Sequence, residues 1–346
     1  MSSSSTAVLV KSRAKYGKLL KAKQYSELLN CKSTSDIVTY LKSNTHYSNS
    51  LEGLQNSVIH RGNLELVLKR HMYDDFANLY SFERLVGEHY FEYMLLKSEV
   101  DQLSLFLRYF LAGKAENFPF NLPSDFRNSS KIDIIALTHA KTFDEILQVL
   151  RPTRYYKLLV PFKTKDNSTL DFTMIESSLD NYMYASTRKL IDKYFTGETH
   201  DELMKLMCAQ AELDNIRKIY RAKKYYDISV DELKTMINHE HFYLNKHKFK
   251  EILNAPSADE VMEILNSTKY RFLLEKHNYI YIDDFAKRLI YKLCRKKIHF
   301  SREPAVVVAS AIIQTEIEIY NITNIIEGKR YNVDNETIKE LLILDE

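Results

Sequence analysis

The chain has 346 residues, and its 49 Lys and Arg nearly balance 46 Asp and Glu, leaving a formal net charge of +3. This balance does not favour nucleic acid as the partner of the whole protein. With only 7 Gly and 6 Pro, the chain has too few turn-forming residues for a sheet-rich architecture. Cys31, Cys208 and Cys294 are far apart and odd in number, which indicates reduced thiols of a cytoplasmic protein and not a disulfide framework.

The predicted elements are helices throughout, because apolar residues recur with helical spacing and no alternating strand pattern of useful length occurs. Short helices precede long ones three times along the chain. In chain order we expect a basic helix over 6–23 with short helices to Leu51, helices over Leu64–Leu79 and Phe82–Leu111, a loop over Phe118–Ser130, short helices to Leu159, a break over Pro161–Ser168, helices over Leu170–Phe195 and Asp201–Lys224 separated by Gly197, short helices over Val230–Ile237, Lys246–Leu253 and Ala258–Leu265, long helices over Ile282–Ile298 and Glu303–Glu327 with Gly328 as the stop, and a closing helix over 333–344. The fold class is all-α.

One stretch, Ala255–Tyr270, has two relatives, Lys32–Tyr47 and Ala140–Tyr155. Each copy has an Asp before a short apolar run, where it would cap a helix start, and a Thr-x-Tyr group after it. This predicts one helical unit used three times, with approximate repeats over 6–95, 96–208 and 209–328 in a single assembly. The matching residues are Asp36, Thr45 and Tyr47; Asp144, Thr153 and Tyr155; and Asp259, Thr268 and Tyr270.

A second repeated signature belongs to the long helices. Glu212, Asp214, Asn215 and Arg221 match Glu99, Asp101, Gln102 and Arg108, while Glu318, Asn321 and Lys329 repeat the offsets of Glu212, Asn215 and Lys223. Glu212 and Arg221 lie about 180° apart on one helix, so they cannot pair with each other there. We expect polar contacts that set the register between helices, and the alternative is a solvated charged face. The candidates for such contacts are Glu99, Glu212, Asn215, Glu318 and Asn321.

Several kinds of chemistry are excluded or disfavoured. No two Gly lie closer than nine positions, which excludes the common phosphate-binding Gly-rich loops and the nucleophile elbow. The tightest His group, His239, His241 and His247, lacks the spacing of a zinc site, so we expect no metal. The Asp283–Asp284 pair is better explained by helix capping than by acid–base catalysis. We therefore expect no catalytic residues and no cofactor.

Positive charge is concentrated in two segments. Residues 1–26 hold six Lys or Arg and no acid, and Lys287–Arg302 holds seven and no acid. The face Lys292, Arg295 and Lys296 is either a solvated helix back or a surface for an acidic protein, with nucleic acid as a third alternative.

A membrane-spanning segment is not expected. The start Ser2–Ser5 lacks the order of a signal peptide. The longest strongly apolar run without charge, Pro304–Thr315, has 12 residues, whereas a spanning helix needs roughly 20.

The order and spacing of these signatures resemble the C/d family of connector proteins in rotary V-type and A-type ATPases over nearly the whole chain. The resemblance rests on the three Asp…Thr-x-Tyr units, on Glu212-Leu-Asp-Asn-Ile-Arg-Lys-Ile-Tyr-Arg-Ala-Lys, and on Glu318-Ile-Tyr-Asn-Ile with Glu327-Gly-Lys. One departure is that the first copy has no clear Glu-x-x-Asn element before Arg13-Ala-Lys.

This resemblance implies three pseudo-symmetric helical bundles arranged as a funnel. It implies a non-enzymatic connector on the cytoplasmic side of a membrane rotor ring, which accepts the central stalk and passes torque in an ATP-driven or ATP-forming ion transporter. Central-stalk proteins and ring proteolipids would be the partners, with peripheral contact to the membrane complex and no cofactor. The funnel interior or mouth would include some of Arg13, Lys15, Arg108 and Arg221. The alternatives are a helical-repeat adaptor outside any ATPase, a nucleic-acid-binding helical protein and, last, an enzyme.

Overall fold

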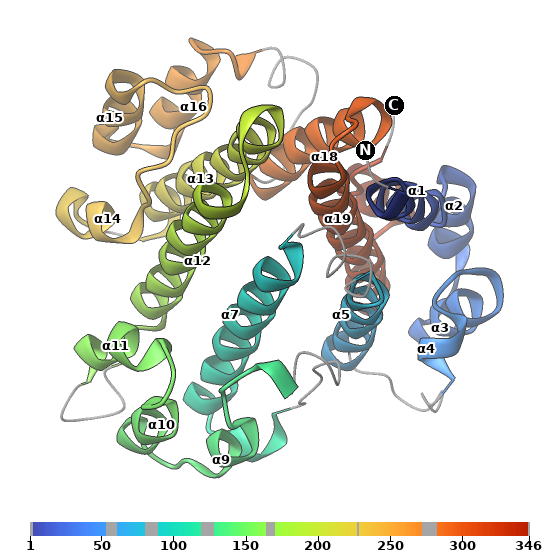
Figure 1. Ribbon diagram of the computed structural model, residues 1–346, viewed down its shortest axis with the longest axis horizontal. Coiled ribbons are helices and arrows are strands. Elements are labelled where there is room, and N and C mark those ends of the chain that lie inside the picture. Colours follow the sequence, from blue (N-terminus) through green and yellow to red (C-terminus); the bar gives the residue numbers. More distant parts are fainter. Residues whose placement is uncertain are drawn as a thin grey trace. The chain divides into compact units, whose positions relative to one another are not determined.

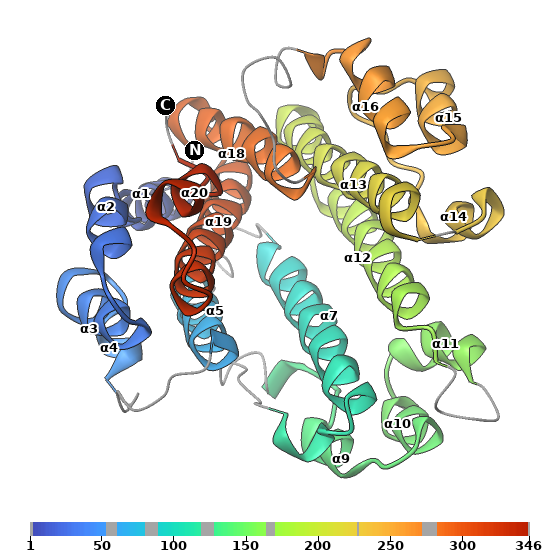
Figure 2. The ribbon, with the colours of Figure 1, turned by 180° about the vertical axis from the view of Figure 1, so that it is seen from behind.

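A computed structural model describes residues 3–52, 61–79, 89–118, 128–163, 170–226, 228–271 and 282–344. Throughout these ranges every regular element is an α-helix or a short 3-10 helix (Figures 1 and 2). The all-α prediction is therefore confirmed. Most of the expected loop over 118–130 and of the break over 161–168 lies outside the described residues.

The chain forms two compact units, each assembled from stretches that are distant in the sequence. Unit 1 contains Met1–Tyr90, Thr196–Gln210 and Lys269–Glu346, and unit 2 contains Phe91–Phe195 and Ala211–Thr268. The division falls within helix α13 (Gly197–Tyr225). The expected repeats over 6–95, 96–208 and 209–328 stay a prediction.

Helix α19 (Pro304–Arg330) is the central element of unit 1. It packs against α1 (Ser3–Gly17), α3 (Thr34–Asn44), α5 (Arg61–Ala77), α18 (Ile282–Phe300) and α20 (Asn335–Glu340). Figure 2 shows α20 beside α19. Because apolar residues surround α19 on most sides, most of its residues are buried. The unit also includes α2 (Ala22–Asn30) and α4 (Ser48–Leu51).

The length and hydropathy of α19 would also allow it to cross a membrane. It is the one helix of this kind among the described residues, and it exceeds the 12-residue apolar run read from the sequence. However, 83% of its most apolar window is buried inside the protein. Its apolar surface is therefore used in the core of unit 1.

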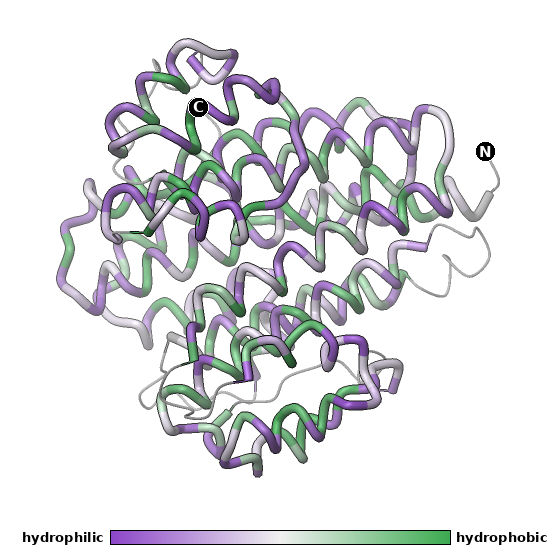
Figure 3. The backbone as a smooth tube through the Cα atoms, turned by 90° about the vertical axis from the view of Figure 1, so that its left-hand side faces the viewer, coloured by the Kyte–Doolittle hydropathy of each residue, from purple (hydrophilic) through white to green (hydrophobic). Residues whose placement is uncertain are grey.

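Unit 2 consists of long helices and several short ones. Apolar and polar segments alternate along the chain in Figure 3, as expected for helices with one buried face. The helices are α7 (Tyr90–Leu111, from its second residue), α9 (Ile134–His139), α10 (Phe143–Leu150), α11 (Tyr155–Leu159), α12 (Phe172–Tyr194), the second half of α13, α14 (Val230–Met236), α15 (Lys246–Asn254) and α16 (Ala258–Asn266), with 3-10 turns η1 (Ala115–Asn117) and η2 (Val160–Phe162).

The single basic helix expected over 6–23 is in fact two helices. Helix α1 ends at Gly17 and α2 begins at Ala22. Between them, the backbone N–H of Leu20 donates a hydrogen bond to the carboxylate of Glu318 on α19. A tertiary contact thus satisfies a backbone group that a continuous helix would have used internally.

The prediction that Gly328 stops the last long helix is wrong. Gly328 lies inside α19, and a Cβ atom there would come within 2.4 Å of the Ile338 side chain on α20. The helix ends instead at Asn332, whose φ is 55°. The N–H of Val333 bonds the carbonyl of Gly328 at 2.8 Å, and the N–H of Asn332 bonds that of Lys329 at 3.3 Å, which is a Schellman ending. The closing helix α20 is shorter than the expected 333–344.

Candidate functional site

The three repeated stretches begin in the same way, with a helix capped by a hydroxyl. This corrects the expectation that the Asp residues are the caps. The Asp side chains lie in the first turn, where their charge suits the helix dipole. The caps are Ser33, Thr142 and Ser257, which accept the backbone N–H of Asp36, Glu145 and Glu260, respectively, at 3.1–3.2 Å.

The Thr-x-Tyr group closes each of these stretches with a turn. The hydroxyls of Thr45, Thr153 and Thr268 donate to carbonyls three or four residues earlier, at 2.5–2.7 Å. In the first two copies the Tyr N–H donates back to the Thr hydroxyl at 3.3 and 3.2 Å. This turn places the tyrosines in the interior, because Tyr47, Tyr155 and Tyr270 are at most 1% exposed.

The two repeated signatures meet at buried carboxylates. The hydroxyl of Tyr155 donates to Glu99 at 2.8 Å, and the hydroxyl of Tyr47 donates to Glu318 at 2.8 Å. The third carboxylate, Glu212, accepts the backbone N–H groups of residues 242, 243 and 244 at 2.7–3.3 Å. Each Glu is at most 3% exposed, so these bonds satisfy charges that would otherwise be costly to bury.

The partner of the first tyrosine explains the apparent departure in the first repeat. Sequence analysis found no Glu-x-x-Asn element near Arg13. In unit 1, however, Tyr47 bonds Glu318, which lies 271 residues further along the chain. The N-terminal part of the chain therefore uses the carboxylate supplied by the last long helix.

The Asn three residues after the Glu fastens a returning segment of backbone. Asn215 donates to the carbonyl of Asn238 at 2.9 Å and accepts its N–H at 2.9 Å. Asn321 makes the same pair of bonds with Ile343, both at 2.8 Å. Gln102 holds the matching position on α7, but the residues 22 and 23 positions beyond it lie outside the described residues.

The residue between Thr and Tyr is basic in all three copies, a signal that the sequence analysis missed. The residues are His46, Arg154 and Lys269. The Arg154 guanidinium lies 3.0 Å from Glu99, and Nε2 of His46 lies 3.5 Å from Glu318. In these two copies the side chain that follows the Thr therefore contacts the same carboxylate as the Tyr.

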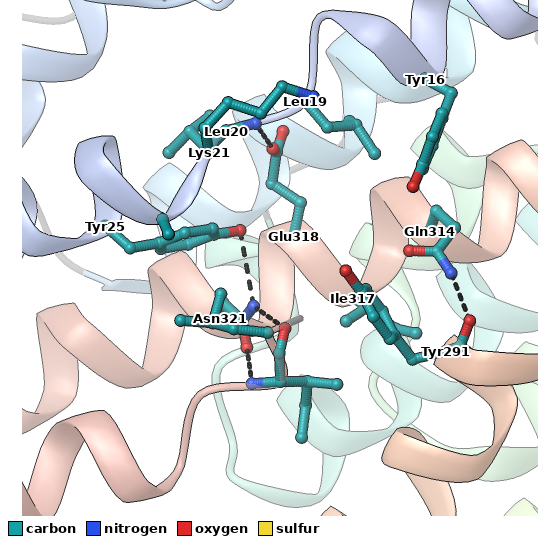
Figure 4. Close-up of a pocket in the computed structure, with 13 residues that line it drawn as sticks. Tyr16, Leu19, Leu20, Lys21, Tyr25, Tyr291, Gln314, Ile317, Glu318 and Asn321 are labelled. Carbon is teal, nitrogen blue, oxygen red and sulfur yellow. Dashed lines mark hydrogen bonds between the residues drawn. The ribbon is translucent and has the colours of Figure 1, made fainter. Parts of the chain in front are cut away.

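A cavity of about 160 Å³ borders Glu318 in unit 1. Figure 4 shows the Glu318 carboxylate pointing toward Leu20, with Tyr25 and Asn321 on one side and Tyr16 and Gln314 on the other. Burial raises the pKa of Glu318 to about 7, although the Leu20 N–H, the Tyr47 hydroxyl and the charge of Lys21 oppose this rise. The cavity therefore has one titratable carboxyl group at its wall.

Two histidines extend this polar cluster away from the cavity. The rings of His46 and His71 are 5.3 Å apart, and Nε2 of His71 lies 3.9 Å from Asp75. Burial, together with the neighbouring His71, lowers the pKa of His46 to about 4, and burial also lowers the pKa of His71. Asp75 in turn pairs with Lys15 at 3.1 Å.

Unit 2 holds a separate buried ion cluster that was not recognised from the sequence. The ammonium of Lys218 lies 3.1 Å from Asp180 on α12 and 2.9 Å from Asp214 on α13. Burial and the neighbouring Asp214 raise the pKa of Asp180 to about 6. Lys218 thus links two long helices.

Three of the expected partner-contact residues are engaged within the chain. Arg13 donates to the carbonyls of Ile298, His299 and Ser301 at the end of α18, at 2.8–3.4 Å. Lys15 pairs with Asp75, as above, and Arg108 pairs with Glu176. By contrast, the side chains of Arg221, Lys292, Arg295 and Lys296 are exposed or half-buried.

The described residues contain no group of three or more His, Cys, Asp or Glu side chains placed to hold a metal ion. Asp284 is not a simple helix cap, because it is buried and accepts the hydroxyl of Tyr320 at 3.0 Å. The absence of metal and of catalytic residues from the whole chain stays a prediction.

These observations define a protein of repeated helical stretches that are joined by buried Glu–Tyr and Asn–backbone contacts. A family model described as "ATP synthase (C/AC39) subunit" matches residues 8–341, and the chain belongs to this family. It is similar to the C-type subunit of the A-type ATP synthase of Methanocaldococcus jannaschii, with 24% identity over 96% of this chain and 84% of that protein. It is also similar to the proteins of the same name from Methanosphaera stadtmanae (22% identity, 96% and 86%) and Methanobrevibacter smithii (24%, 96% and 86%).

Proposed function

We propose that this chain is a non-catalytic connector of a rotary A/V-type ATPase. In this proposal it seats the central stalk on the membrane rotor ring and transmits torque between them. The observation that carries the proposal is the match to the ATP synthase (C/AC39) family over residues 8–341. The relatives from the A-type ATP synthases of three archaea support it, because they match over 96% of this chain.

A part that transmits torque must resist twisting, and the buried contacts within each unit favour such stiffness. In unit 1, α19 is packed by five other helices and is tied to the N-terminal residues through Tyr47 and Leu20. In unit 2, Glu99 holds Tyr155 and Arg154. Close packing transmits strain because interiors have low compressibility. The proposal includes three bundles arranged as a funnel around the foot of the stalk.

The proposal places the chain at the cytoplasmic face of the membrane complex without crossing the bilayer. The burial of α19 supports this placement, because the helix that could span a membrane already packs inside unit 1. The cations of α18 at Arg295 and Lys296 suit an acidic protein surface on a neighbouring protein of the complex.

The test is association of the purified chain with the two central-stalk proteins, followed by sedimentation velocity at low and at physiological salt. We expect a complex at micromolar concentration that weakens as salt rises, because charged contacts at an interface rim are screened. If the stalk proteins sediment independently of the chain at low salt, the connector function is wrong. A gel shift with duplex and single-stranded DNA at 50 mM salt checks the nucleic-acid alternative.

A further inference from the structure

Two buried glutamates at the same repeat position differ in the base that accompanies them. Glu99 and Glu318 each accept a tyrosine hydroxyl at 2.8 Å and are each 3% exposed. Beside Glu99 stands Arg154, whose guanidinium is always charged. Beside Glu318 the corresponding residue is His46, a base that can lose its charge near neutral pH.

The surroundings of His46 favour its neutral form. Its Nδ1 atom is buried and has no hydrogen-bond partner within the described residues, so a ring proton there would lose water without replacement. On α5, His71 and the carboxylates of Asp74 and Asp75 face the cluster, and on the N-terminal side Lys18 and Lys15 add positive charge. The Lys18 backbone favours the charged ring, but burial outweighs it. Asp75 is already paired with Lys15, which leaves little negative charge to favour an imidazolium.

Glu318 therefore lacks the fixed cation that its counterpart has. The groups that face it are the Tyr47 hydroxyl, Nε2 of His46, the Leu20 N–H and, across the cavity, Lys21 and Tyr25. No ion pair joins Lys21 to Glu318 among the residues that the structure describes. An ionised carboxylate here would be buried beside neutral partners, a costly arrangement that a bound proton relieves.

The cavity gives that proton a route to and from solvent. It has a volume of about 160 Å³ and its wall includes Glu318, Gln314 and three tyrosines. About five water molecules would fit at the liquid volume of roughly 30 Å³ each, and the polar wall offers them partners. The wall is formed by residues from the α1–α2 region, α18, α19 and the C-terminal residues 343–344.

We propose that Glu318 and His46 form a proton-binding site that bridges the N-terminal residues 16–47 and helix α19. The equivalent contact in unit 2, Glu99 with Arg154, is a fixed ion pair. Proton binding at Glu318 lets its hydroxyl form donate to Nε2 of His46, while the carboxyl group still accepts Tyr47 and Leu20. The contact in unit 1 thus responds to pH near neutrality, and the contact in unit 2 does not. This inference concerns the chain itself and is independent of the proposed connector function.

The direct test is the infrared band of a protonated carboxyl group, recorded as a pH 6 minus pH 8 difference spectrum of the full-length chain. Other buried acids such as Asp180 contribute to this spectrum, so the assignment rests on variants. We expect Glu318→Gln to remove one band component and the matched Glu99→Gln to remove none.

A reciprocal exchange of the bases makes the test specific. His46→Arg places a fixed cation beside Glu318, and an opposite charge at this distance lowers a carboxyl pKa by about 1–3 units. The Glu318 component should therefore vanish from the pH 6–8 window. Arg154→His removes the fixed cation from Glu99, and a new component that Glu99→Gln abolishes should appear.

Retention of the full band in Glu318→Gln, or an unchanged band in a folded His46→Arg protein, overturns the proposal. Should His46→Arg fail to fold, the comparison of Glu318→Gln with Glu99→Gln still decides the matter. A component that is lost in both of these variants would show that the two contacts titrate alike, which also contradicts the proposed difference.

Discussion

At the scale of single residues, the tyrosine of the Thr-x-Tyr group does two things at once in the first two copies. Its ring fills the interior and its hydroxyl bonds a buried carboxylate that comes from another part of the chain, as Tyr155 does for Glu99 and Tyr47 for Glu318. Because both partners are withheld from water, the loss of either leaves a polar group unsatisfied. These residues are therefore expected to be far more sensitive to substitution than tyrosines at the surface.

Removal of one hydroxyl measures this contribution. We expect Tyr155→Phe and Tyr47→Phe each to lower the free energy of unfolding by about 1.5–3 kcal/mol, because each loses a hydrogen bond to a buried acidic group. Urea unfolding followed by circular dichroism provides the measurement. Tyr226→Phe is the control, since Tyr226 is 59% exposed and should change stability by less than about 0.5 kcal/mol.

The pH dependence of stability follows from Glu318. Its pKa is about 7 in the folded protein and about 4.3 in an unfolded chain, so its contribution to stability is complete below pH 4 and is lost as pH rises through 7. Between pH 6 and pH 8, wild type should lose about 1.4 kcal/mol relative to Glu318→Gln. Urea titrations of both proteins at the two pH values test this. Equal pH slopes for the two proteins would contradict the elevated pKa.

At the scale of helices, α19 shows how a long apolar element is placed by its neighbours. Its periodic apolar residues predict a helix, but its burial depends on five other helices that cover it. Its end is decided by close packing with α20, since Gly328 leaves room for Ile338, and by the left-handed conformation of Asn332. Asn321 then holds Ile343 of the segment after α20. The C-terminal residues are thus attached at two positions on one helix.

Substitution of Gly328 tests this packing. In an exposed helix interior, Gly→Ala would stabilise by up to about 1 kcal/mol, but here the new Cβ lies 2.4 Å from Ile338. We expect Gly328→Ala to destabilise the protein by about 1–3 kcal/mol and to speed amide exchange in α20. Gly62→Ala in α5 is the matched control, because nothing lies within 4 Å of its Cβ position, and it should be neutral or stabilising.

At the scale of the whole molecule, the chain uses its repeats out of sequential order. The first Tyr bonds the last Glu, so unit 1 joins residues from both ends of the chain with part of α13. Most of the charged residues in the repeated signatures serve these internal contacts. The surface cations that remain for a partner include Arg221 and Lys296.

A charge reversal separates partner contact from folding. We expect Lys296→Glu to leave the unfolding midpoint unchanged and to weaken association with the stalk proteins by at least about tenfold at low salt. Lys157→Glu, which is also exposed, is the control for a general charge effect. Sedimentation of each variant with the stalk pair gives the comparison, and equal affinities would exclude the α18 face from that interface.

The sequence by itself predicted the fold class and the long helices. The expected ranges Leu170–Phe195 and Ile282–Ile298 agree closely with α12 and α18, because apolar periodicity reports which face of a helix is buried. It also identified Glu99, Glu212, Asn215, Glu318 and Asn321 as a set, since repetition is visible without coordinates. Their proposed role in setting helix register stays a prediction.

The tertiary structure alone decided which of these residues meet. Periodicity describes local geometry, whereas the bond between Tyr47 and Glu318 joins positions 271 residues apart. It also decided that Gly328 provides clearance for Ile338 and that a break after Gly17 lets Leu20 reach a carboxylate. Burial determines the protonation of Glu318, and burial depends on the whole surrounding set of helices, which no single stretch of sequence specifies.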